Sequence, residues 1–447
     1  MEPQEGPSWE GVGMKIAVLG GGITGLVTTH LLCERGHEVS CLEASSRTGG
    51  LCQSETVDGF VADRAGGHII FSKDQEVLDF ALSLLEPVGY HTTERNTFIY
   101  YKGNHVQYPF ENGLCDLDPE DTFTCLNGYI EAQFARRQGA PEPDNFHDWC
   151  LWRFGDGICN IFMHPYNQKI WNVDLKELGT RWVSGRVPDA PMEDVLRSAL
   201  GMRTSGYRHQ SVFHYPLAGG FEAICDGVLR RLPDGVVQTG TPCTSVARDG
   251  DAWIVNGERY DRVVSTIPLQ ELIKTLTDDV PGEVREAFES LDWTSLMTVF
   301  LALDRSDPPP HSWVYFPDPA DGPQNRITWL SNYSPGNAPA GCSSIMAEVT
   351  YYQDPSGSDE EVTQQVVDGL SNAGFMEPDQ LRFSRVWHNR YAYILYRHQL
   401  EENLDVVRSW CADTGLDIIG RFGNYSYFNS DMCIRASLDL VADRYPS

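Results

Sequence analysis

The chain contains 447 residues, of which 41% are hydrophobic and 22% are charged. This length exceeds that of one ordinary domain, and the apolar fraction excludes a wholly disordered protein. The formal net charge of −29, from 63 acidic and 34 basic residues, would repel nucleic acids and anionic membranes, so we expect neither as a partner. Residues 1–13 lack the basic and apolar regions of a secretory signal, and together with scattered cysteines they predict a cytoplasmic protein.

The first ordered stretch has the pattern of a dinucleotide-binding fold. A strand-like run, Lys15–Leu19, leads into the glycine-rich turn Gly20–Gly25. A helix-like run, Leu26–Arg35, follows, and a second strand-like run, Glu38–Leu42, ends at Glu43. This order of strand, glycine turn, helix, strand and acid is the context that makes a G-x-G-x-x-G motif specific.

Each residue of this motif has a physical role. Gly20 permits the tight turn, Gly22 lets the backbone approach a pyrophosphate, and Gly25 allows the helix to pack closely on the strand. Glu43 stands where an acid accepts hydrogen bonds from ribose hydroxyls. Two further glycine pairs, at Gly49 and Gly50 and at Gly66 and Gly67, favour FAD over NAD, because backbone must pass close to a large cofactor.

The rest of the chain alternates between helical and strand-like patterns. Helical spacing covers residues 121–137, 146–154 and 192–200 within a mostly helical stretch, 111–210. Residues 237–264 alternate and contain Asp-Gly and Asn-Gly turns, which predicts small hairpins. Residues 262–266 predict a buried strand that returns to the first sheet. Strand-like runs at 298–303, 313–316, 327–331 and 344–351 predict a second, mainly antiparallel sheet.

Several longer motifs then make a family resemblance specific. The narrowest are Gly66-Gly-His-Ile-Ile-Phe-Ser72 and Phe162-Met-His-Pro-Tyr-Asn-Gln-Lys-Ile-Trp171. Others are Tyr108-Pro-Phe-Glu-Asn112, Trp182-Val-Ser-Gly-Arg-Val187, Tyr215-Pro-Leu-Ala-Gly-Gly220, Trp313-Val-Tyr-Phe-Pro317, Leu330-Ser-Asn-Tyr-Ser-Pro335 and Gly420-Arg-Phe-Gly423. By these motifs the chain resembles the UDP-galactopyranose mutases, more the eukaryotic-type than the shorter bacterial enzymes, over roughly residues 15–444.

The resemblance implies an α/β fold with three domains. The Rossmann-like FAD-binding domain would comprise residues 14–80, 211–270 and 405–447. A helical domain of residues 111–210 would be inserted, and an antiparallel β-sheet domain for the substrate would comprise residues 81–110 and 271–404. The implied reaction interconverts pyranose and furanose forms of a nucleotide-sugar, with N5 of reduced FAD acting as nucleophile at the anomeric carbon. NADPH or NADH is the candidate reductant, and the oligomeric state stays open.

The resemblance also implies roles for individual residues. Diphosphate-binding arginines match Arg186 and Arg326, and tyrosines that contact phosphates match Tyr315, Tyr393 and Tyr427. His68 matches a histidine beside the isoalloxazine, and Asn167 and Trp171 match a substrate-contacting pair. Arg421, Asp431 and Met432 match positions around the flavin. Tyr108, Phe110 and Glu111 match the nucleobase site, and Gln210 stands near a family asparagine close to flavin and substrate.

One of these positions departs from the family pattern. The eukaryotic-type enzymes carry glutamine where this chain has Glu111. Glutamine can donate and accept hydrogen bonds to uracil, whereas an ionised glutamate only accepts. Guanine and cytosine offer amino donors, so Glu111 raises the hypothesis of a base other than uracil; the alternative is that Glu111 is protonated or points to solvent. The segment Tyr391–Tyr396 replaces a proline-containing segment, which leaves the sugar open.

Other functions compete with the mutase interpretation. A FAD-dependent oxidoreductase acting on a nucleotide-linked sugar would keep the same arginines and tyrosines that bind the diphosphate, here called the diphosphate clamp. Fold alone does not fix function. An amine oxidase would have no use for the clamp. A non-catalytic relative would lack His68 or the arginines, and these residues are present.

Overall fold

The computed structural model describes residues 13–183, 187, 191–202 and 211–445. By their internal contacts these residues form two compact units. The first unit comprises the described residues of 13–50, 225–290 and 402–445, and the second comprises the described residues of 51–224 and 291–401. Residues 51–80 and 211–224, which the sequence assigns to the flavin domain, thus belong to the second unit, and the division into three domains stays a prediction. Two predicted site residues, Arg186 and Gln210, lie outside the described residues.

The first unit is built on a five-stranded parallel sheet in the order β19-β13-β1-β2-β9. Its strands are β1 (Lys15–Leu19), β2 (Glu38–Leu42), β9 (Val237–Gln238), β13 (Arg262–Ser265) and β19 (Leu416–Ile418). Strand β13 pairs with β1, which confirms the predicted return to the first sheet. All four interior residues from Ile16 to Leu19 are fully buried, as expected for a parallel sheet covered on both faces.

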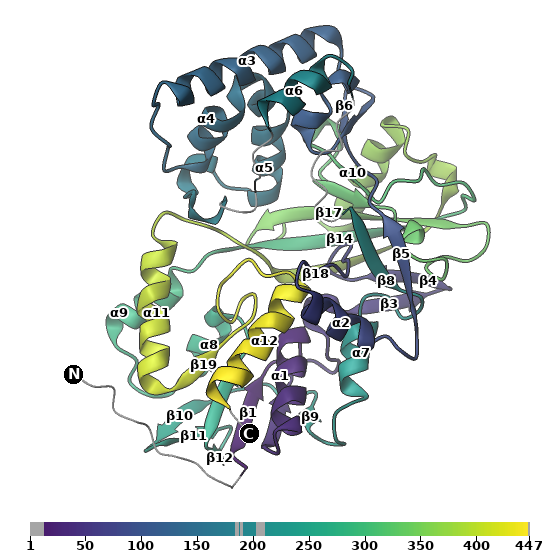
Figure 1. Cartoon of the computed structure of the whole chain (residues 1–447). Helices are drawn as coiled ribbons and strands as arrows, with labels where there is room; N and C mark the ends of the chain where they lie inside the picture. Colours follow the sequence, from purple (N-terminus) through teal and green to yellow (C-terminus); the bar gives the residue numbers. More distant parts are fainter. Residues whose placement is uncertain (1–12, 184–186, 188–190, 203–210, 446–447) are drawn as a thin grey trace. The chain divides into compact units, whose positions relative to one another are not determined.

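Helices α1 (Ile23–Glu34) and α12 (Ser430–Arg444) lie side by side in this unit (Figure 1). Small polar residues make the contact, with Thr28 Oγ1 donating to Ser437 Oγ over 3.0 Å and Ser437 Oγ donating to the carbonyl of Thr24 over 3.2 Å. The unit also contains the hairpins β10 (Val246–Asp249), β11 (Ala252–Val255) and β12 (Glu258–Tyr260) and the helices α8 (Leu269–Thr275) and α9 (Gly282–Glu289). Helices α7 (Ala223–Leu229) and α11 (Leu400–Thr414) begin in the second unit and continue here.

The second unit contains a seven-stranded sheet in the order β18-β14-β17-β16-β15-β6-β7. Its strands are β6 (Thr97–Tyr101), β7 (Asn104–Gln107), β14 (Trp293–Leu303), β15 (Trp313–Tyr315), β16 (Arg326–Thr328), β17 (Ser343–Tyr352) and β18 (Leu381–Ile394). The sheet is mainly antiparallel, as predicted, but β6 and β15 pair in parallel, so it is mixed. Every residue of β14 is buried, and α10 (Asp359–Asn372) packs on the same apolar core.

The remaining elements of the second unit are two small sheets and a group of helices. Strands β3 (Ser54–Val57) and β4 (Phe60–Asp63) pair, as do β5 (Tyr90–Glu94) and β8 (Val212–Pro216). The helices are α2 (Gln75–Ser83), α3 (Pro119–Arg137), α4 (Phe146–Ile158), α5 (His164–Trp171) and α6 (Met192–Ala199). A π-helical turn, Cys159–Met163, joins α4 to α5. Among the described residues, no helix combines the length and apolarity that crossing a membrane requires.

Candidate functional site

In the first unit, the glycine-rich turn adopts the geometry that its sequence requires. Gly20 has a φ of +98°, a conformation that side chains disfavour. A Cβ atom at Gly25 would lie 1.8 Å from the carbonyl oxygen of Gly20, so only glycine lets α1 pack this closely on the end of β1. The turn therefore depends on these two glycines for its own shape.

Gly22 differs, because the space beside it is open. It is the N-cap of α1 with φ −75° and ψ 179°, and a Cβ atom there would meet nothing within 4 Å. No side chain caps the first turn of α1, and that turn contains no acidic residue. A helix N-terminus with free N–H groups and positive dipole is suited to a pyrophosphate.

Two further predicted residues lie beside this turn. Glu43 accepts hydrogen bonds from the N–H groups of Gly21 (2.7 Å) and Ser45 (2.8 Å), which hold its carboxylate at the end of β2. Gly49 donates its N–H to the carbonyl of Gly21 (2.8 Å), and a Cβ atom at Gly50 would lie 3.4 Å from Cα of Gly22. The backbone therefore passes close to the turn, and these residues fit the nucleotide part of FAD.

The C-terminal predicted residues also belong to the first unit. Arg421 donates to the carbonyl of Phe428 (2.8 Å), and its guanidinium lies 4.5 Å from the ring centre of Tyr427. Asp431 is in the first turn of α12, and Met432 is 38% exposed. Tyr427 is thus in a different unit from Tyr315 and Tyr393, the tyrosines predicted to share its role.

In the second unit, Arg326 is held by a glutamate that the sequence analysis did not identify. Nε and Nη2 of Arg326 lie 2.9 Å and 2.5 Å from Oε1 of Glu348. Arg326 stands opposite Glu348 in the register of β16 and β17, and the Glu348 side chain is 1% exposed. Burial disfavours the charged guanidinium, but Glu348 and the neighbouring tyrosines together more than offset this, and the pKa of Arg326 lies well above its ordinary value.

Tyrosines surround this ion pair. Tyr315 is paired with Arg326 in the register of β15 and β16, and its ring lies 5.1 Å from the ring of Tyr166. The hydroxyl of Tyr393 lies 3.4 Å from Oε2 of Glu348. Tyr166, like Glu348, was missed by the sequence analysis, although it stands in the same motif as Asn167. Burial raises the pKa of Tyr166 well above its ordinary value, so its hydroxyl stays protonated and can donate to an anion.

The predicted substrate pair on α5 lies beside Tyr393, one of the three tyrosines of this tyrosine cluster (Tyr166, Tyr315 and Tyr393). Trp171 Nε1 donates to Asn167 Oδ1 (3.1 Å), and Asn167 Nδ2 donates to the carbonyl of Met163 (2.7 Å). The Trp171 ring meets the Tyr393 ring edge-on at 6.2 Å. Asn167 and Trp171 are one helical turn apart, which places both on one face of α5. Both are buried.

The predicted base-binding residues lie next to the tyrosines around Arg326. Tyr108 lies 5.2 Å from Tyr315, and Phe110 stacks on Phe162 at 5.2 Å. Glu111 is only 7% exposed, which contradicts the alternative that it points to solvent. Burial raises the pKa of the Tyr108 hydroxyl.

A cation also lies at this end of the cluster. The guanidinium of Arg95 is 4.6 Å from the ring centre of Tyr108 and 4.7 Å from that of Trp313, so it lies over both rings. Arg95 Nε donates to Thr97 Oγ1 over 3.1 Å. Arg95 was missed by the sequence analysis, because no local pattern links it to Tyr108.

The second glycine pair packs directly against the ion pair. A Cβ atom at Gly66, whose φ is +89°, would lie 2.7 Å from Oε1 of Glu348. A Cβ atom at Gly67 would lie 2.6 Å from Oγ1 of Thr328 on β16. His68 follows and stacks on Phe221 with ring centres 5.0 Å apart. The Gly66–His68 loop, Arg326 and Glu348 therefore form one site.

A buried carboxylate anchors this loop. Oδ1 of Asp63 accepts hydrogen bonds from Ser54 Oγ (2.7 Å), Tyr215 OH (2.9 Å) and the N–H of Phe221 (3.0 Å). Burial raises the pKa of Asp63 to about 6, although these donors favour its charged form. Asp63 thus joins the end of β4 to Tyr215 on β8 and to Phe221, on which His68 stacks.

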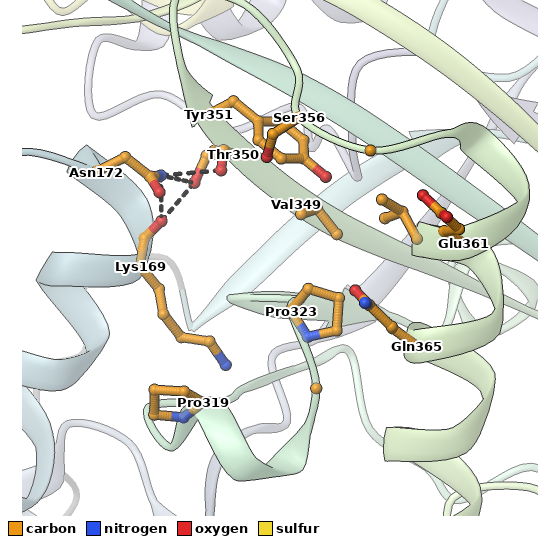
Figure 2. A pocket seen from close by; sticks show the side chains of 13 residues that line it. Lys169, Asn172, Pro319, Pro323, Val349, Thr350, Tyr351, Ser356, Glu361 and Gln365 are labelled. Carbon is orange, nitrogen blue, oxygen red and sulfur yellow. Dashed lines mark hydrogen bonds between the residues drawn. The ribbon is translucent and has the colours of Figure 1, made fainter.

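A cavity of about 500 Å³ lies between the C-terminal end of α5, strand β17 and the start of α10 (Figure 2). Lys169 lines it and donates to the carbonyls of Phe316 and Asp318, each over 3.0 Å. Burial lowers the pKa of Lys169 to about 8. The residues that line this cavity include none of Tyr166, Tyr315, Tyr393, Asn167 and Trp171. No metal-ligand cluster of His, Cys, Asp and Glu exists among the described residues.

Comparisons with known proteins bear on both units. The profile of the family described as flavin containing amine oxidoreductase matches residues 23–406. The crystal structure of reduced UDP-galactopyranose mutase is similar with a TM-score of 0.88 and 26% identity, covering 97% of this chain and 96% of that chain. The resemblance predicted from the motifs is therefore confirmed.

Curated relatives match over shorter stretches. The mitochondrial protoporphyrinogen oxidase of Nicotiana tabacum is 21% identical over 317 residues, which cover 60% of this chain and 61% of the relative. UDP-galactopyranose mutase of Mycoplasma pneumoniae is 35% identical over 75 residues, or 16% of this chain and 19% of the relative. The chain thus spans less than two thirds of the length of these curated relatives.

Proposed function

Because the chain belongs to the flavin-containing amine oxidoreductase family, we propose that it binds FAD and acts as a nucleotide-sugar mutase. The reaction would interconvert the pyranose and furanose forms of UDP-galactose or a related nucleotide-sugar. Similarity to reduced UDP-galactopyranose mutase over nearly the whole chain supports this choice within the family. A reducing cofactor such as NADPH or NADH and a cytoplasmic location belong to the same proposal.

The observation that carries the proposal is the tyrosine-rimmed guanidinium of Arg326. Glu348 orients two of its N–H groups and leaves the others for a ligand. A guanidinium can grip phosphate oxygens bidentately, and hydroxyls of Tyr315 and Tyr393 can donate to the same oxygens. The site can therefore hold a diphosphate and offset the charge that this group gains when it leaves the sugar.

The remaining residues would orient the sugar. Asn167 and Trp171 present an amide and an aromatic ring on one face of α5, and both are fixed by their mutual hydrogen bond. His68 is held against Phe221 beside the Gly66–Gly67 backbone. When bound in its reduced form, FAD would supply the nucleophile for the anomeric carbon. Positioning, rather than acid or base strength alone, is what these residues contribute.

An anaerobic assay tests the proposal. The purified flavoprotein, with and without dithionite, is mixed with UDP-galactofuranose, and products are separated by chromatography against a UDP-galactopyranose standard. We expect conversion by the reduced protein only, with no change in mass. Absence of conversion of UDP-, GDP- and CDP-sugars by a protein that retains and reduces its FAD would contradict a mutase.

The same assay distinguishes a nucleotide-sugar oxidoreductase, which the family description favours as the second candidate. An oxidoreductase would start from oxidised flavin, bleach it, and remove two hydrogens from the sugar. Mass spectrometry of the product therefore separates the two functions directly. A bleached flavin with a product lighter by two hydrogens would replace the mutase proposal.

The nucleobase is a finer part of the proposal. Glu111 is buried near Tyr108, and in this proposal its carboxyl group contacts the base. An ionised carboxylate accepts two N–H groups from guanine but finds a poorer match in uracil. Titration calorimetry with UDP, GDP and CDP, on the parent chain and Glu111→Gln, tests this. A preference for UDP that the substitution does not change would contradict it.

A further inference from the structure

Between the two predicted substrate residues on α5 stands a lysine that the proposed reaction does not use. Lys169 comes two residues after Asn167 and two residues before Trp171. A helix turns by about 100° per residue, so the Lys169 side chain leaves α5 on a different side from both of them. Lys169 is half-buried, and burial lowers its pKa to about 8. Removing an ammonium group from water is unfavourable unless hydrogen bonds replace that water, so its contacts in the protein hold it in place.

The side chain of Lys169 joins α5 to the end of β15. Its Nζ atom donates to the backbone carbonyls of Phe316 and Asp318, each over 3.0 Å. Phe316 directly follows Tyr315, the last residue of β15, whose hydroxyl belongs to the proposed diphosphate site. Because both acceptors are main-chain atoms, these hydrogen bonds fix the path of the chain after Tyr315 relative to α5.

The backbone of Lys169 joins α5 to β17. Oγ1 of Thr350 donates to the carbonyl of Lys169 over 2.6 Å. Asn172, which follows α5 in a left-handed conformation with a φ of +55°, donates its Nδ2 to the same carbonyl (2.7 Å) and to the carbonyl of Thr350 (2.9 Å). Thr350 comes two residues after Glu348, the partner of Arg326. Lys169 thus links the helix of the substrate pair to two strands that carry residues of the proposed diphosphate site.

We infer that Lys169 is a positioning residue, which holds the substrate pair on α5 at a fixed distance from the residues that bind the diphosphate. This inference rests on the proposed function. A nucleotide-sugar spans the two groups of residues, because its diphosphate is bonded to the anomeric carbon of its sugar. Freedom between α5 and β15 would let the sugar move relative to its leaving group, and a misplacement of about 1 Å can slow a reaction about a hundredfold.

The cavity beside Lys169 makes a direct test possible. It has a volume of about 500 Å³, and Lys169, Asn172, Pro319 and Thr350 are among the residues that line it. Figure 2 shows the Lys169 side chain extending toward Pro319. Lys169→Ala removes the ammonium group and leaves space that is open to this cavity. A small alkylammonium ion can enter that space and donate to the two freed carbonyls.

The first measurement separates positioning from binding. The flavin-loaded full chain is compared with Lys169→Ala in the anaerobic assay, using the nucleotide-sugar that the parent converts, and calorimetry gives the affinity for its nucleoside diphosphate. We expect kcat to fall at least about tenfold and the affinity to change less than about threefold, since Arg326 and Glu348 keep their own contacts. Lys176→Ala is the matched control, because Lys176 is an exposed lysine in the same unit, and this variant should behave as the parent does.

Chemical rescue then tests the hydrogen bonds themselves. Methylammonium chloride should restore the kcat of Lys169→Ala, with a response that saturates. Tetramethylammonium chloride is the control, because this ion has the same charge but no N–H group. Lys169→Met keeps the length of the side chain and gives the comparison of kcat with affinity if Lys169→Ala does not fold. Equal kcat for the parent and the folded variant, or a loss in Lys169→Ala that methylammonium does not restore, would overturn the inference.

Hydrogen exchange distinguishes this inference from the proposed function. In Lys169→Ala, the amides of residues 316–321 should exchange faster than in the parent, and methylammonium should slow them again, whichever reaction the protein catalyses. This result, together with a parent that converts no nucleotide-sugar, would contradict the proposed function and support the link through Lys169. Unchanged exchange in the variant of an active parent would overturn the link alone.

Discussion

Arg326 is the residue on which the proposed diphosphate site depends most. Lysine keeps the charge of arginine but lacks its planar fork, so Arg326→Lys loses bidentate contact with phosphate and with Glu348. We expect affinity for UDP, or for the preferred nucleoside diphosphate, to fall about tenfold or more, since a charge-assisted hydrogen bond contributes about 1.5 to 3 kcal/mol. Titration calorimetry of the flavin-loaded protein measures this.

The control is a surface arginine in the same unit. Arg382 on β18 is 47% exposed, and its Nη1 atom lies 3.5 Å from Oδ1 of Asp304. Arg382→Lys should leave nucleoside diphosphate affinity unchanged. Equal affinities for the parent, Arg326→Lys and Arg382→Lys would remove Arg326 from the binding site.

The raised pKa of Asp63 predicts how the stability of the folded protein changes with pH. Its pKa is raised to about 6 in the folded protein, so the folded state binds this proton more tightly than the unfolded state, where an aspartate titrates near its ordinary value of 3.8. The contribution of Asp63 to stability is therefore greatest in acid and falls as the pH rises from about 4 to about 6, by on the order of 3 kcal/mol. Asp63→Asn cannot ionise and should lack this decline.

Urea unfolding at several pH values measures the effect as the difference between parent and variant. The rest of the chain contributes equally to both, so its many carboxylates cancel in that difference. Asp58→Asn is the matched control, because Asp58 is an exposed residue in the same hairpin and its left-handed conformation suits asparagine. Identical pH slopes for the parent and Asp63→Asn would contradict the assignment.

At the scale of elements, two substitutions in the glycine turn before α1 distinguish an effect on folding from an effect on cofactor binding. Gly25→Ala would place a Cβ atom 1.8 Å from the Gly20 carbonyl and should disrupt the turn itself. Gly22→Ala meets no protein atom within 4 Å and has an ordinary φ, so the chain should fold normally. If the pyrophosphate approaches Gly22, the added methyl group occupies its space, and FAD content should fall severalfold.

The ratio of flavin absorbance to protein absorbance gives the FAD content, and circular dichroism gives the fold. Gly282→Ala is the control, since Gly282 also has open space around it but begins α9 away from the turn. Full FAD occupancy in Gly22→Ala would show that the cofactor does not approach this residue.

The elements themselves were predictable where one local pattern decides them. Strands β1 and β2, helix α3 and the hairpins before β13 all appear at or near their predicted positions. Strand β18 was not predicted, because its arginines and histidine interrupt the alternation; as the edge of its sheet, it needs only one buried face. Helix α10 was also missed, although Ser358 and Glu361 form a capping box at its start.

The candidate site was predictable only where a motif names its residues. Asn167 and Trp171 stand in one helical motif, and the structure joins them as expected. Glu348 could not be found this way, since it meets Arg326 through the register of β16 and β17, and register is not contained in either strand alone. The same limit applies to Arg95, since Arg95 and Tyr108 directly follow β5 and β7, and their contact depends on where the ends of these two strands lie.

At the scale of the whole molecule, the dominant electrostatic feature is the large excess of negative charge. With 63 acidic and 34 basic residues, acidic side chains repel each other in the compact state more than in the expanded, unfolded chain. Exposed ion pairs such as Arg197–Glu193 oppose this, but each contributes only about 0 to 1 kcal/mol. The unpaired excess of negative charge should therefore decide how stability responds to salt.

We expect the melting temperature to rise when ionic strength increases from about 0.01 M to about 0.15 M, because the screening length falls from about 30 Å to about 8 Å. Differential scanning fluorimetry in sodium chloride measures the rise. Choline chloride is the control, since general screening does not depend on which cation is present, whereas binding of sodium to an acidic cluster would. A melting temperature that falls with salt would mean that attractive ion pairs outweigh the repulsion that the net charge of −29 implies.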